Sequence, residues 1–208
     1  MILVACICTI CLLSWYYLLT GAGTGMSAVA MTSWQFPPPV YNSIASIWLP
    51  EYWALMVIMW WVMMIAMMLP SATPMVLLYA RVQRHHAKGV NVAGVTAPTM
   101  AFLSGYLASW LVFSLVATAL QWGLEQQQLL HGMMMWSSNH TLSGVFLLLA
   151  GSYQFSNFKR ICLRHCRSPA EFLSRHWHKG RIGALRMGWR HGLYCVGCCW
   201  ILMLLLFV

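Results

Sequence analysis

The sequence predicts an all-α fold, a bundle of five transmembrane helices in a single membrane domain that covers residues 1–208. Of the 208 residues, 61% are hydrophobic and only 7% are charged, whereas a soluble domain carries about a quarter charged residues. The apolar residues also gather in five stretches, each close to the ~20 residues that a helix needs to cross a bilayer. So few charges cannot cover a water-facing surface, which indicates that lipid covers much of this protein.

The five predicted spans are residues 2–20, 52–80, 97–122, 141–158 and 192–208. The first lacks the basic start and small-residue cleavage site of a signal peptide, so we interpret it as a helix. The second is the longest and contains Pro70 and Pro74, which predict a kink or a tilt. The last ends without a polar or aromatic anchor. That ending fits a chain in which one more helix is missing after Val208.

The basic residues orient these helices. All 12 Lys and Arg residues lie in two loops, residues 81–88 and 159–190, against 3 acidic residues in the whole chain. Loops on the cytoplasmic side carry the excess of Lys and Arg, which predicts a cytoplasmic N-terminus and a cytoplasmic 159–190 loop. A net charge of +9 can also indicate nucleic-acid binding. The clustering between apolar stretches favours the topological interpretation, so we expect no nucleic-acid partner.

The 159–190 loop is expected to contain a short amphipathic helix. Ser168, Pro169 and Glu171 resemble a capping box with proline at the first helical position. The helix that follows should end near Gly180.

Two clusters of cysteine and histidine are the strongest candidates for a functional site. They lie at the cytoplasmic ends of the fourth and fifth predicted spans. Within each cluster the spacing places the side chains on one face of a helix. Thiolate and imidazole ligands suit Cu(I) or Zn²⁺. The candidate ligands are Cys162, His165, Cys166, His191, Cys195, Cys198 and Cys199.

A shared site requires sulfurs of the two clusters within about 4 Å of each other, because metal–sulfur bonds are near 2.3 Å. The alternative is that these cysteines act only as small buried hydrophobes, which is also our interpretation of Cys6, Cys8 and Cys11. Disulfide pairing is not expected, because the predicted compartment keeps thiols reduced.

Methionine is unusually frequent, with 16 residues in the chain. Thioethers are soft ligands that favour Cu(I), so a methionine stripe on the second predicted span is a possible entry path or second site. Packing between helices is the alternative. A further cluster, residues 133–135 with His131 and His140 on either side, is a possible site on the outer face. The stripe consists of Met56, Met59, Met63 and Met67, with Met64, Met68 and Met75 beside it.

The sequence contains little that indicates catalysis. The acidic residues Glu51, Glu125 and Glu171 lie in three separate loops, so no pair of carboxylates is available for acid–base chemistry. We therefore expect no catalytic activity of the chain's own.

Three segments resemble a known family. Residues 60–70, 162–169 and 188–200 are similar to the motifs of an uncharacterised bacterial family of predicted metal-binding integral membrane proteins. The resemblance runs from about Glu51 to Val208. It implies a bacterial inner-membrane protein with a metal site, and it implies no reaction.

The leading hypothesis is therefore a membrane protein that binds or handles a soft metal ion, with copper favoured over zinc. Its partners would be the lipid bilayer and other membrane subunits. The alternative is a non-catalytic accessory or structural subunit of a larger membrane complex. Such a complex could be a copper-dependent membrane oxidoreductase.

Overall fold

The computed structural model describes residues 2–20, 48–86, 92–127, 140–178 and 180–207, and these residues are helical with short connections. Within them no strand is present, which confirms the all-α fold class. A short 3-10 turn, Leu205–Phe207, follows the last helix. The helices are α1 (Ile2–Leu19), α3 (Pro50–His86), α4 (Val92–Gln126), α5 (His140–Gln154), α6 (Asn157–Arg167), α7 (Pro169–His176) and α8 (Gly180–Leu204).

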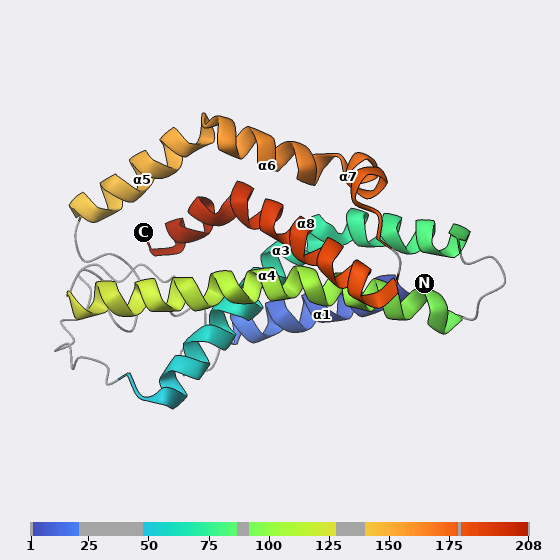
Figure 1. Ribbon diagram of the computed structural model, residues 1–208. Coiled ribbons are helices and arrows are strands. Elements are labelled where there is room, and N and C mark those ends of the chain that lie inside the picture. Colours follow the sequence, from blue (N-terminus) through green and yellow to red (C-terminus); the bar gives the residue numbers. More distant parts are fainter. Residues whose placement is uncertain (1, 21–47, 87–91, 128–139, 179, 208) are drawn as a thin grey trace.

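Helix α4 is the centre of the bundle, because it packs against α8 and against α3. Helix α1 lies along α3, and α6 lies along α8 (Figure 1). The α4–α8 contact is close enough to require glycine. A Cβ atom at Gly188 would collide with the backbone carbonyl of Phe102, and one at Gly105 would collide with that of Leu185. Backbone contact of this kind fixes α8 firmly on α4.

Two of the described helices, over Pro50–His85 and Gly94–Gln126, are long and apolar enough to cross a membrane. The apolar part of α1 is shorter, and α5 has 15 residues, which span only about 22 Å against a ~30 Å hydrocarbon core. Helix α8 joins its apolar half to a half that contains Arg181, Arg186 and Arg190. The predicted count of five spans is therefore not supported.

The fourth predicted span, residues 141–158, is not one helix. Helix α5 ends at Gln154, and α6 begins at Asn157. The hydroxyl of Ser156 accepts hydrogen bonds from the backbone N–H groups of Phe158 and Lys159. This N-cap starts a new helix, because it satisfies donors that would otherwise need the preceding turn.

Helix α3 continues through both of its prolines. Each proline removes one backbone hydrogen bond. In Figure 1 the direction of α3 changes along its length, as the sequence predicts for a helix with internal prolines.

The short helix predicted in the 159–190 loop is α7. Pro169 occupies one of its first positions, but the Ser168 side chain makes no capping hydrogen bond, so the predicted capping box does not form. Gly180, with a φ of 83°, begins α8. Most of the second half of the predicted loop is therefore helix α8.

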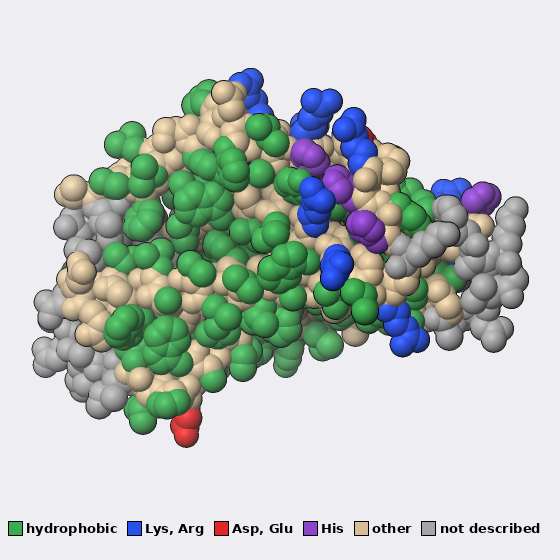
Figure 2. Space-filling view, in the orientation of Figure 1, with side chains coloured by type: hydrophobic (Ala, Val, Ile, Leu, Met, Phe, Trp, Pro, Cys, Tyr) green, Lys and Arg blue, Asp and Glu red, His purple; other side chains and the backbone are tan. Residues whose placement is uncertain are grey.

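The surface has two zones. Large apolar side chains are exposed on α1, α4 and α5, and Leu148 is 76% exposed. Figure 2 shows Lys, Arg and His side chains gathered instead over α6, α7 and the first turns of α8. Extended apolar surface is typical of proteins that associate with a membrane or with other chains.

Candidate metal centre

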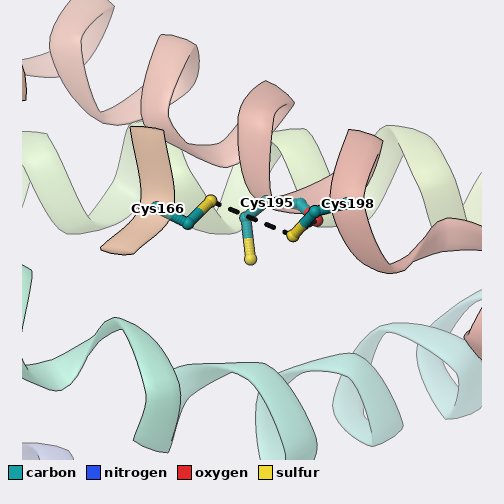
Figure 3. Close-up of side chains that lie close together, drawn as sticks. All are labelled: Cys166, Cys195 and Cys198. Atoms are coloured by element: carbon teal, nitrogen blue, oxygen red, sulfur yellow. Dashed lines mark hydrogen bonds between the residues drawn. The ribbon is translucent and has the colours of Figure 1, made fainter. Parts of the chain in front are cut away.

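Three cysteine sulfurs from two helices meet in one place. The Sγ atoms of Cys166 (α6), Cys195 and Cys198 (both α8) lie within 4.8 Å of one another. The Sγ atoms of Cys166 and Cys198 are 4.0 Å apart. Figure 3 shows Cys166 facing the two cysteines of α8, with a dashed line between the sulfurs of Cys166 and Cys198. The two sequence clusters thus converge within the distance that a shared site requires.

The site lies inside the molecule. Cys195 and Cys198 are buried, and Cys166 is half-buried. Cys195 belongs to a cluster of buried apolar residues that includes Met64 and Trp110. Such surroundings exclude water, which favours soft sulfur coordination of a weakly hydrated ion.

Contacts on both sides of the cysteines hold α6 against α8. Cys162 is buried beside Gly197, where a Cβ atom would lie 2.8 Å from the Cys162 Sγ. One residue before Cys166, the ring of His165 stacks on Tyr194 with 4.3 Å between ring centroids. These contacts set the axial register that places Cys166 opposite Cys198.

Tyr106 of α4 connects the cysteines to α3. Its hydroxyl lies 3.4 Å from the Sγ of Cys195 and donates to the Met68 carbonyl at 3.1 Å. The tyrosine is fully buried, which removes competition from water. Tyr106 therefore fixes the position of one sulfur.

Nothing in the sequence around Tyr106 indicates this role. The neighbouring small residues, such as Gly105 and Ser109, were the only signal that this part of α4 contacts another helix.

Cys199 lies beside the three cysteines, with its Sγ 3.2 Å from that of Cys198. Cys162 faces Gly197, so it contributes to packing at the edge of the site. Of the five predicted cysteine ligands, three thus form a compact group and two are its neighbours.

The two predicted histidine ligands point elsewhere. The Nδ1 of His165 lies 2.9 Å from the Ile161 carbonyl of its own helix. His191 is buried among the rings of Phe102, Tyr106 and Phe172. Its Nδ1 has no hydrogen-bond partner in the part of the chain that the structure describes. The structure therefore places no imidazole among the three sulfurs.

The methionine stripe of α3 packs beside the same cluster. Met56, Met59 and Met64 are buried in it, and Met75 belongs to a second buried cluster. The thioether of Met56 accepts a hydrogen bond from Gln121 at 3.8 Å. These contacts are those of packing residues, and the proposed second site remains a prediction. The remaining stripe residues, Met63, Met67 and Met68, are partly buried against the cluster. The outer cluster, residues 133–135 with the side chains of His131 and His140, lies outside the described residues.

The cysteines are all free thiols. The hydrogen bond with Cys195 raises the pKa of the Cys166 thiol above its ordinary value, and burial adds to the shift. A metal ion that binds here must therefore displace a tightly held proton.

Residues 57–208 match the family model PpoB2, which is described as a copper chaperone. The chain belongs to this family. No curated protein and no solved structure shows significant similarity to the chain. The PpoB2 match includes the three clustered cysteines and most of α3. Membership in a copper chaperone family, together with the cysteine cluster, supports copper handling and the metal-binding part of the sequence resemblance.

Proposed function

We propose that this chain is a membrane-embedded copper chaperone that holds Cu(I) between Cys166, Cys195 and Cys198. The observation that carries the proposal is the convergence of three sulfurs from separate helices in a copper chaperone family member. The copper is cargo, so the site must bind it tightly enough to prevent loss and still release it to a recipient protein.

The spacing of the sulfurs suits a trigonal copper site. An ion bonded to three sulfurs at ~2.3 Å places those sulfurs about 4.0 Å apart. The Cys166–Cys198 separation is already 4.0 Å, and the other pairs are within 4.8 Å. Small side-chain movements therefore close the site around an ion.

The number of clustered sulfurs supports our choice of copper over zinc. Structural zinc takes four ligands in a tetrahedron, so it needs one more sulfur. Cys199 is the nearest candidate, but its Sγ is 3.2 Å from that of Cys198. With bonds of ~2.3 Å, a tetrahedral site would need that spacing to open to about 3.8 Å, in addition to the movements of the other three sulfurs. The group of three sulfurs found among the described residues matches the preference of Cu(I) for soft, low-coordinate sites.

Two features of the structure support the proposed placement in a membrane. Helices α3 and α4 satisfy the length and composition of membrane spans, and the apolar side chains of α5 are exposed. By the positive-inside rule, the basic 159–190 segment then lies on the cytoplasmic side of a bacterial inner membrane. The cysteine site would load from that side.

The test is elemental analysis of the full chain purified in detergent after exposure to Cu(I) and Zn²⁺ together. The parent should retain copper in preference to zinc. The double variant Cys166→Ser/Cys198→Ser should lose it, while the control Cys6→Ser, at an exposed thiol of α1, should not. X-ray absorption should show a sulfur-only first shell in the parent. Copper that remains sulfur-bound in the double variant, or zinc in the parent, would refute the proposal.

An accessory-subunit role is the second candidate, and one observation favours it. Leu147, Leu148 and Leu149 on α5 are all exposed, which leaves an apolar face that another membrane chain could cover. A parent chain that retains no metal and is recovered only with a stable membrane partner would favour this candidate.

A further inference from the structure

The buried thiol site needs a route by which copper reaches it, and one cavity lies next to it. An open cavity of about 270 Å³ is formed by the end of α6 and by α7. His165, the residue before Cys166, lines it together with His176, Glu171 and two arginines. Among the described residues no cysteine lines the cavity, but His165 and Cys166 are consecutive residues of α6, so the cavity and the thiol site share the same end of this helix.

In both histidines of this cavity, the Nδ1 atom is used in a hydrogen bond to a backbone carbonyl. The Nδ1 of His165 bonds the Ile161 carbonyl at 2.9 Å, and the Nδ1 of His176 bonds the Phe172 carbonyl at 3.1 Å. A carbonyl oxygen can only accept, so each Nδ1 carries the proton, and the lone pair of the neutral ring is on Nε2. Such a backbone bond orients a histidine and raises its basicity as a metal ligand.

The rings are held in place by aromatic contacts. His165 stacks on Tyr194, and His176 lies 4.9 Å from Phe172, centroid to centroid. Tyr194 and Phe172 in turn contact each other at 6.3 Å. The two imidazoles are therefore carried by one connected aromatic group at the boundary between α6, α7 and α8.

The charges of the cavity are partly compensated. Glu171 pairs with Arg175 at 3.1 Å, which offsets one of the two guanidinium groups near the histidines. Arg164 lies on the outer, exposed side. A monovalent ion meets less repulsion than a divalent one, and a Cu(I) complex with anionic ligands would be attracted to the remaining positive charge.

We infer that His165 and His176 form an entry site for Cu(I), from which the ion passes to Cys166 and then to the three-sulfur site. This inference rests on the proposed copper-chaperone function. In the transfer, the copper bond to the Nε2 of His176 and then that to the Nε2 of His165 break as the copper–Cys166 bond forms, and bonds to the Cys195 and Cys198 sulfurs complete the transfer. The thiol proton leaves to the vacated imidazole nitrogen, and copper remains Cu(I), so no oxidant or reductant is needed.

The test measures loading rate and final occupancy separately. The detergent-purified chain is mixed with the Cu(I)–bicinchoninate complex, and loss of the coloured complex is followed by stopped flow. His176→Gln should slow loading at least about tenfold, a barrier increase of ~1.4 kcal/mol, with unchanged final copper content. The control is His178→Gln, at an exposed histidine that does not line the cavity.

A second measurement isolates the entry site. In Cys166→Ser/Cys198→Ser, one equivalent of Cu(I) should show imidazole scattering by X-ray absorption, and adding His165→Gln and His176→Gln should remove it. Parental loading rates in His176→Gln would overturn the entry site alone. A fall in final occupancy in His176→Gln would also overturn it, because His176 would then contribute to the thiol site itself. A parent with no thiol-dependent copper would instead refute the proposed function.

Discussion

The hydroxyl of Tyr106 lies 3.4 Å from the Sγ of Cys195 while it donates to the backbone carbonyl of Met68. Since these residues belong to α4, α8 and α3, one buried hydroxyl joins three helices at a single sulfur. The relationship makes Tyr106 a positioning residue for the three-sulfur group.

We expect Tyr106→Phe to weaken Cu(I) binding by about tenfold, the lower end of the range for groups that orient metal ligands. The fold should lose only ~1 kcal/mol, the typical value of one hydrogen bond. Chelator competition measures the affinity, and thermal unfolding in detergent measures the stability. If binding is unchanged while stability falls, the hydroxyl only supports packing.

Cys162 and Cys166 provide a matched pair one helical turn apart. Cys166 belongs to the three-sulfur group, whereas Cys162 packs on Gly197. Cys166→Ala should abolish tight copper binding, and Cys162→Ala should keep one copper per chain. Copper content after dialysis distinguishes them. Equal losses in the two variants would mean that the bound state includes Cys162.

Copper occupancy should fall in acid. The pKa of Cys166 is raised, first by its hydrogen bond with Cys195, so this thiol is protonated before the metal binds. Binding releases the proton, and affinity should therefore decrease as the pH falls, by about tenfold per pH unit for each displaced proton. Competition titrations across about pH 5 to 8 measure the slope. An affinity independent of pH would exclude Cys166 as a ligand.

The α4–α8 contact predicts a contrast between two glycines. Gly188→Ala places a Cβ against the Phe102 carbonyl, and overpacking of this kind costs about 1–3 kcal/mol. The unfolding midpoint should fall by several degrees, since ~1 kcal/mol corresponds to about 2–4 °C at this size. Gly151→Ala in α5 is the control, because no atom lies within 4 Å of its Cβ. A midpoint unchanged by Gly188→Ala would show that α8 shifts freely on α4.

The orientation of the chain in the membrane is a separate prediction. Ser174 is exposed on α7, within the basic 159–190 segment. In intact cells, an impermeant thiol reagent should leave Ser174→Cys unlabelled and should label Ser138→Cys, with the parent chain as background. Labelling of Ser174→Cys from outside would reverse the predicted topology and the loading side of the site.

The sequence predicted the existence of the helices better than it predicted their boundaries. Apolar stretches located α1, α3 and α4 closely, because a long run of apolar residues determines a helix through composition alone. It missed the boundary at Ser156, because a serine inside an apolar stretch is also common within membrane helices. The first half of α8 was predicted to be loop, because its arginines lower the hydropathy. Arginine is nevertheless compatible with a helix, so the helix continues through them.

The convergence of the two cysteine clusters followed from helical periodicity, which places i and i+4 residues on one face. Which cysteines meet depends on how far α6 is displaced along α8, and a single sequence carries no signal for that displacement. Cys166 therefore reaches Cys198, while Cys162 meets Gly197 one turn away. His191 of α8 instead faces aromatic residues of α4 and α7.

The close backbone contact at Gly105 and Gly188 has a mechanical consequence. It ties α8, with Cys195 and Cys198, to α4 as one unit, and Tyr106 ties this unit to α3. Cys166 is carried by α6, which is separated from α5 by the helix break before Asn157. We therefore expect the three-sulfur site to open and close by displacement of one short amphipathic helix, α6, against a rigid support. Capture and release of the ion can be controlled without rearranging the helices that cross the bundle.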